Sequence, residues 1–181
     1  MEINYSLESD DFLTQQLYRI TRDKTLQAKR HKQWILLPIV SLAAAIYFYY
    51  IDLKPLAFTT GAYILITFLF YRKYFDFRYK NYFNNFVKKN YAKRIGTKVS
   101  IEFLSTHILA KDEAGETKLK NEQVDYIADL PNHFLLHLKI GEVIIIPKLQ
   151  IDALGLKQNF EDHGFVIVDE SNWQWGQNKY L

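Results

Sequence analysis

The chain has 181 residues, no cysteine and a formal net charge of +3. The absence of cysteine excludes a disulfide framework, a thiolate metal site and a cysteine nucleophile. Residues 1–94 carry 15 Lys and Arg against 7 Asp and Glu, whereas residues 95–181 carry 8 against 13, so a basic half precedes an acidic half.

The first 33 residues are predicted to form a strand and then an amphipathic helix. Residues 3–7 alternate apolar and polar side chains, which is the period of a half-exposed strand. Ser9 is a suitable N-cap, and acidic side chains at Asp10 and Asp11 favour the first turn of a helix. Apolar residues then recur at helical spacing and predict one helix over residues 10–32 (Phe12, Leu13, Leu17, Ile20 and Leu26). A polar segment of this length argues against a cleaved signal peptide.

Residues 34–71 contain two long apolar runs, residues 34–51 and residues 56–71, and neither has a charged side chain. At 1.5 Å per residue the runs predict helices roughly 24 to 27 Å long, close to the ~30 Å hydrocarbon core of a bilayer. Aromatic residues at or near the ends of the runs are typical of a membrane interface (Trp34, Tyr47, Tyr49, Tyr50, Tyr63 and Tyr71). We expect a transmembrane hairpin, and two buried core helices of a soluble protein are the alternative.

The connection between the runs, residues 52–55, permits only a tight turn, with Pro55 suited to opening the second helix. Basic residues are dense outside the runs, whereas the turn has one Lys and one Asp. By the positive-inside rule, we expect both termini in the cytoplasm. The candidate contacts to anionic lipid are the basic residues near the runs: Lys29, Arg30, Lys32, Arg72, Lys73, Arg78 and Lys80.

Residues 72–95 mix aromatic and basic side chains and are predicted to form a helical stem that ends at Gly96. The aromatic residues recur at spacings of three and four, so a helix gathers them on one side. Packing against the N-terminal helix is the favoured interpretation, ahead of contact with anionic lipid and of a nucleic-acid surface. The candidate interface residues are Ile3 and Tyr5 of the first strand and Phe75, Tyr79, Tyr82 and Phe86 of the stem.

From Thr97 the apolar period changes to two, which predicts a separate strand-rich domain over residues 96–170. An antiparallel meander is expected, and residues 3–7 can add to it. A helix is expected from Asp152 to His163, followed by a last short strand at 165–168 and a loosely ordered tail at 171–181. The expected strands of the meander are residues 97–104, 107–111, 116–120, 123–129, 133–140 and 143–146.

Few residues suggest a catalytic or metal-binding role. His133 and His137 are four apart, which separates them by about 13 Å on a strand, so they are interpreted as polar-face residues and not as a metal pair. Acidic residues of the second half, Asp129 among them, fall at turns or alternate strand positions, where solvation explains them. No phosphate-binding loop, nucleophile elbow or HExxH motif occurs. The sequence therefore predicts no enzyme, no metal and no cofactor.

The order of elements resembles the bacterial YcxB-like proteins, which have a two-helix membrane hairpin and a C-terminal domain similar to the pleckstrin-homology fold. Residues 120–151 carry the resemblance: the strand at 124–127 is followed by a hairpin from 134–136 to 143–145 and then by Ile146-Pro147-Lys148 before the final helix. One departure is that the family often has tryptophan where this chain has residues 124–126. The resemblance implies an α+β membrane protein with a hairpin, a helical stem and a pleckstrin-homology-like β domain, and it implies no shared activity.

These features together favour a non-enzymatic protein of the bacterial inner membrane that presents a cytosolic β domain to a protein partner. Two alternatives are left open, an immunity protein against a membrane-acting toxin and a sensor of anionic lipid. The expected partners are membrane lipids and an unidentified protein, without nucleic acid, and homo-oligomerisation is left open.

Overall fold

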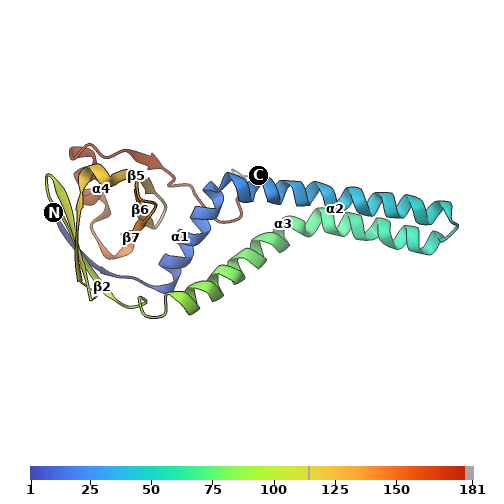
Figure 1. Ribbon diagram of the computed structural model, residues 1–181, viewed down its shortest axis with the longest axis horizontal. Helices are drawn as coiled ribbons and strands as arrows, with labels where there is room; N and C mark the ends of the chain where they lie inside the picture. Colours follow the sequence, from blue (N-terminus) through green and yellow to red (C-terminus); the bar gives the residue numbers. More distant parts are fainter. Residues whose placement is uncertain (114, 178–181) are drawn as a thin grey trace. The chain divides into compact units, whose positions relative to one another are not determined.

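The computed structural model describes residues 1–113 and 115–177, apart from the side chains of residues 30, 31, 33, 37 and 72 (Figure 1). The fold is α+β, as predicted. It divides into two compact units. One comprises residues 1–16 and 83–174 and contains all the strands, and we call it the strand unit. The other comprises residues 17–82 and the segment from Trp175, and we call it the helical unit.

The strand unit contains two four-stranded sheets. The first has the order β1-β2-β3-β4, with bounds Glu2–Ser6, Lys98–Phe103, His107–Asp112 and Gly115–Lys120. The second has the order β7-β6-β5-β8, with bounds Val143–Pro147, His133–Leu138, Val124–Asp129 and Ile167–Asp169. Two short 3-10 turns, Asn121–Gln123 and Lys148–Gln150, precede β5 and follow β7.

A purely antiparallel meander is wrong for the last strand, because β8 pairs with β5 in parallel. The reason is the connection: helix α4, Ala153–Asp162, lies between β7 and β8 and carries the chain back across the sheet. Such a crossover is what a parallel neighbour requires, whereas short turns join β2 to β3, β3 to β4, β5 to β6 and β6 to β7. Asp152 caps α4 by accepting a hydrogen bond from the Gly155 N–H, close to the predicted helix start.

Phe160 of α4 joins the two sheets in one core. Its ring packs edge-on against Phe103 of β2, with centroids 5.3 Å apart, and against Phe134 of β6, with centroids 5.5 Å apart. Phe160 is fully buried, and the inward side chains of both sheets surround it in one hydrophobic cluster. Edge-to-face pairs of this kind add to the stabilisation that burial itself provides.

Strand β1 lies beside β2 although more than ninety residues separate them in the chain. Ile3 pairs with Ile101 and Tyr5 with Val99, so the predicted addition of the first strand to the sheet is confirmed. Helices α1, α2 and α3 therefore form an insertion between two neighbouring strands of one sheet, as the colours of Figure 1 show. Both ends of this insertion attach to the strand unit.

The prediction of one helix over residues 10–32 is wrong. Helix α1, Ser9–Arg22, ends before Asp23, and helix α2, Lys24–Tyr50, begins after it. The Asp23 carboxylate accepts hydrogen bonds from the N–H groups of Thr25 and Leu26, at 2.9 and 3.1 Å. These bonds satisfy donors that have no partner inside a helix, so they favour a new helix start at this point.

Helix α3 runs from Lys54 to Asn90, so the second apolar run and the stem are one continuous helix. Asp52, with a φ of 63°, reverses the chain before it, and Pro55 lies in its first turn as predicted. Gly96, with a φ of 83°, follows the turn that ends the stem. By length and composition, α2 and the segment Lys54–Tyr71 are able to cross a membrane.

The prediction of a loosely ordered tail is wrong for residues 171–177, and residues 178–181 lie outside the described chain. Trp173 is buried in the strand unit, and its backbone N–H donates to the Glu170 carbonyl at 2.8 Å. The indole N–H of Trp175 donates to the Asp76 carbonyl of α3 at 3.1 Å. The two tryptophans therefore anchor the tail through burial and a hydrogen bond.

Candidate functional site

The helical unit has an exposed apolar surface. None of the described side chains in the apolar stretches of α2 and Lys54–Tyr71 is buried, which contradicts the alternative of two buried core helices. Side chains such as Phe58 and Leu65 are 74% and 66% exposed. Water-soluble monomers rarely expose a contiguous apolar surface of this size.

Aromatic residues mark two levels along this hairpin. Tyr47, Tyr49 and Tyr50 are exposed near the turn. Trp34 of α2 stacks on Phe68 of α3 with ring centroids 5.3 Å apart, at the other end of the apolar stretch. Trp34 and Tyr50 are about 24 Å apart along α2 at 1.5 Å per residue.

Tyr63 does not mark either level. It lies about 13 Å along α3 from Lys54, in the middle of the apolar stretch, so its predicted place at a boundary is wrong.

The basic residues predicted to contact lipid lie at the end of the hairpin away from the turn. The stacking of Trp34 on Phe68 brings the segments before Trp34 and after Tyr71 to this same end. Their side chains are exposed for five of the seven: Lys29, Lys32, Lys73, Arg78 and Lys80. The side chains of Arg30 and Arg72 lie outside the described residues.

The stem aromatics fall into two sets. Phe75 stacks on Tyr79 with centroids 4.1 Å apart, whereas Tyr82 is 62% exposed. Phe86 packs edge-on against Tyr91, which stacks on Phe12 of α1 at 4.6 Å. The predicted packing of the stem on the N-terminal helix therefore holds for the segment near Phe86.

Ile3 and Tyr5, proposed from the sequence as interface residues, are core residues. Each is only 5% exposed and belongs to the hydrophobic cluster of the strand unit. Burial, and secondarily the negative charge of Asp11, raises the pKa of the Tyr5 hydroxyl far above its usual value. These two side chains are thus largely withdrawn from solvent while β1 stays in the sheet.

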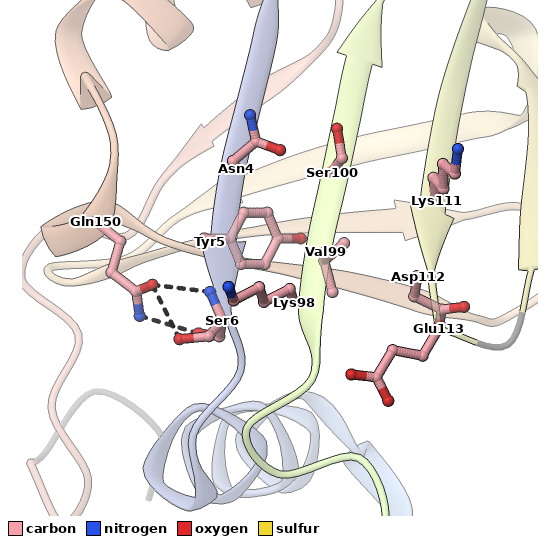
Figure 2. Close-up of a pocket in the computed structure, with 10 residues that line it drawn as sticks. All are labelled: Asn4, Tyr5, Ser6, Lys98, Val99, Ser100, Lys111, Asp112, Glu113 and Gln150. Atoms are coloured by element: carbon pink, nitrogen blue, oxygen red, sulfur yellow. Dashed lines mark hydrogen bonds between the residues drawn. The ribbon is translucent and has the colours of Figure 1, made fainter.

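A hollow of about 560 Å³ lies on the first sheet (Figure 2). The strand register aligns Asn4, Ser100 and Lys111 in one row across β1, β2 and β3. At the edge of β1, the Gln150 amide accepts from the Ser6 N–H at 2.8 Å and donates to the Ser6 carbonyl at 2.9 Å. The lining residues are Asn4, Tyr5, Ser6, Lys98, Val99, Ser100, Lys111, Asp112, Glu113 and Gln150.

The hollow combines mainly apolar surface with amide, hydroxyl and charged groups of both signs, which is the mixed character of a protein interface. Sequence reasoning missed it. Strand alternation marks Asn4, Ser100 and Lys111 as outward positions, but only the register between strands distant in the chain aligns them.

Two further predictions, that His133 and Asp129 face solvent, are wrong. His133 is not a polar-face residue, because it is 8% exposed and its Nε2 lies 2.7 Å from Asp11 Oδ1. Asp129 is not a solvated residue, because it is 3% exposed and pairs with Lys148 and Lys157. Both carboxylates fix neighbouring elements, α1 on β6 and α4 on β5.

Within the described residues, no group of three or more His, Asp and Glu side chains is arranged to hold a metal ion. His137 stacks on Tyr126 with ring centroids 4.3 Å apart, so the two histidines of β6 have separate roles. No family model, curated protein or solved structure matches this chain. The resemblance to YcxB-like proteins stays a prediction.

Proposed function

We propose that the protein is a non-enzymatic, membrane-anchored binding protein. Helix α2 and the first half of α3 span the bacterial cytoplasmic membrane as a hairpin. The strand unit, a pleckstrin-homology-like domain of the YcxB-like type, remains tethered at the cytosolic surface and binds a protein partner.

The exposed apolar surface of the hairpin carries this proposal. It extends between the tyrosines near the turn and the Trp34–Phe68 stack, a length of about 24 Å along α2. Covering it with lipid tails removes the cost of hydrating it, which amounts to about 25 cal/mol for each Å² of apolar surface. A helical hairpin also satisfies its backbone hydrogen bonds internally, as the hydrocarbon core requires.

The charge distribution supports the orientation. Exposed basic residues gather at the end of the hairpin away from the turn. At the turn, Lys54 lies 3.0 Å from Asp52, so this short loop has no net positive charge. An excess of Lys and Arg on one side is typical of the cytoplasmic face, which supports a cytosolic location for both termini and the strand unit.

The pleckstrin-homology-like assignment is supported by the layout of the strand unit. Four strands form the first sheet, β5 to β8 form the second, and helix α4 packs Phe160 between them. The hollow at Asn4, Ser100 and Lys111 is the surface we assign to the partner, because it combines concavity with apolar and polar groups on a sheet.

Site-specific labelling tests the membrane topology directly, because the chain has no native cysteine. Lys54→Cys at the turn should react with a membrane-impermeant maleimide in intact cells. Glu113→Cys in the strand unit should react only after the cells are made permeable. Equal labelling of both variants in intact cells, or release of the wild-type protein by alkaline carbonate, would reject the proposal.

Capture of the partner tests the hollow. Tagged full-length protein is purified from native membranes in mild detergent and its partners are identified by mass spectrometry. Ser100→Arg, which fills the hollow, should abolish capture of a stoichiometric protein. Thr117→Arg introduces the same group at an exposed position of β4 outside the hollow and should leave capture intact. Loss in both variants or in neither would contradict this assignment.

A further inference from the structure

Helix α3 presents an exposed cationic face just beyond its apolar stretch. We define this cationic face by Lys73, Tyr74, Phe77, Arg78 and Lys80. Tyr74 and Phe77 are 60% and 67% exposed, and the three basic side chains are exposed as well. At 3.6 residues per turn these five positions span about 160° of the helix circumference, on the side away from Phe75 and Tyr79.

The opposite side of the same segment is covered. Phe75 stacks on Tyr79, and the Trp175 indole donates to the Asp76 carbonyl. The tail passes close to the Asp76 carboxylate, since a Cβ added to Gly176 would lie 3.2 Å from its Oδ2. Asp76 is the single acidic residue between positions 72 and 94. Asp76 lies three residues from Lys73 and four from Lys80, so the three basic residues and this acidic neighbour together carry a net charge of +2.

Because of the direction of α3, the side chains of the cationic face lean toward the apolar stretch. In an α-helix each Cα–Cβ bond leans toward the N-terminus, and the N-terminus of α3 is at the turn. The side chains of Lys73, Arg78 and Lys80 thus lean back toward Tyr71. Lys80 is about 13 Å beyond Tyr71 along the axis, and a long flexible lysine shortens this distance by several Å.

Helix α2 runs the other way, so its basic side chains lean away from the apolar stretch. Lys29 and Lys32 precede Trp34, and the N-terminus of α2 is at Lys24. The two helices therefore differ in how well their cations reach a membrane surface, although both place them at the same end of the hairpin.

We propose that the cationic face binds the headgroups of anionic phospholipids in the leaflet at the basic end of the hairpin. This inference rests on the proposed membrane insertion. The ammonium and guanidinium groups pair with lipid phosphates, while Tyr74 and Phe77 lie at the interface, where aromatic rings are favoured. Arg78 supplies a planar fork that matches a phosphate with two hydrogen bonds.

The test uses full-length protein reconstituted in vesicles of phosphatidylcholine and phosphatidylglycerol at 7:3. The protein is extracted mildly, and native mass spectrometry measures the retained ratio of the two lipids. The triple variant Lys73→Gln/Arg78→Gln/Lys80→Gln should lose phosphatidylglycerol enrichment by about 10-fold or more, since each cation near a membrane is worth roughly 5-fold. Lys29→Gln/Lys32→Gln should lose less.

The matched control is Lys88→Gln/Lys89→Gln/Lys93→Gln, which removes the same charge from exposed positions farther along the chain. It should retain wild-type enrichment. Equal enrichment in the triple variant and the wild type would overturn the inference, and so would equal loss in the control.

Flotation of the same vesicles separates this result from the proposed function. Wild type and all variants should float with the lipid and resist carbonate extraction. If the wild-type protein inserts without enriching phosphatidylglycerol, the proposed lipid binding by the cationic face is rejected, but the proposed membrane insertion is not. If the wild-type protein fails to float, the proposed membrane insertion is rejected.

Discussion

His133 and Asp11 form a buried pair, with 2.7 Å between Nε2 and Oδ1, although 122 residues separate them in the chain. Both side chains are only 10% exposed. The second carboxylate oxygen of Asp11 accepts from the Glu8 N–H at 2.7 Å, which fixes the start of α1. One carboxylate therefore stabilises both the helix start and its attachment to β6.

Removing one member of this pair should be strongly destabilising. Asp11→Leu or His133→Leu leaves a buried polar partner unpaired, and we expect a loss of about 3 kcal/mol or more in the free energy of unfolding. The double variant should recover part of that loss, because no unpaired group remains. Urea unfolding of the full-length protein in detergent, followed by circular dichroism, measures these differences. Additive losses in the double variant would show that the two side chains act independently.

Asp129 should be far more sensitive to substitution than either of its lysines. It is nearly fully buried, and it pairs with Lys148 and, at 2.7 Å, with Lys157. Asp129→Ala leaves two cations without their shared partner, and we expect a loss of about 3–5 kcal/mol. Lys157→Gln should cost at most about 1 kcal/mol, because that side chain is 39% exposed. Thermal unfolding of both variants compares them, and equal losses would contradict the central role of the carboxylate.

The Lys157 pair also predicts a pH dependence. The hydrogen bond to Asp129 is the main cause that raises the pKa of the Lys157 ammonium above its ordinary value. Because the folded-state pKa of Lys157 lies above its unfolded-state pKa, its stabilisation is complete at pH values below the unfolded-state pKa. This stabilisation is lost as the pH rises through the folded-state pKa. The stability difference between wild type and Lys157→Gln should therefore shrink at strongly alkaline pH. A difference that grows between pH 9 and 12 would contradict the sign.

Tyr5 predicts a second alkaline effect. Burial raises the pKa of its hydroxyl, so the folded protein holds the neutral phenol when the unfolded chain already ionises near pH 10. Above that pH the wild-type protein should lose stability by up to about 1.4 kcal/mol for each pH unit. Tyr5→Phe cannot ionise and should lose less. The unfolding free energy of each protein is measured at pH 8 and pH 11. An equal decrease in both proteins would show that the folded state does not keep the Tyr5 hydroxyl neutral.

Phe160 should be the most costly single truncation in α4. Its ring contacts Phe103 and Phe134, one from each sheet, and it is fully buried. Phe160→Ala leaves a cavity between the sheets and should lower the unfolding free energy by about 3–5 kcal/mol. Leu154→Ala, at an exposed position of the same helix, is the control and should change it by less than about 0.5 kcal/mol. Similar effects from the two substitutions would contradict the placement of the core.

Patterns among neighbouring residues were sufficient to predict the features that depend only on neighbouring residues. The two uncharged runs predicted helices of membrane-spanning length, because length and apolar content alone set that property. Alternation of side chains predicted the strands from 97 to 146 closely, since strand periodicity depends only on neighbours in the chain. A local signal was also overlooked, because Asp23 with Thr25 after it is a helix start that can be read from the sequence.

Contacts between distant residues decided the rest. The parallel pairing of β8 with β5, the row of Asn4, Ser100 and Lys111, and the burial of Asp129 and His133 depend on which strands and helices meet. A charged or polar side chain in an alternating strand looks solvated in the sequence, because its burying partner lies up to 122 residues away. The sequence by itself determined most of the strands and the two long apolar helices. Only the tertiary structure decided the paired polar groups and the hollow, because the desolvation and register that create them arise when the elements pack together.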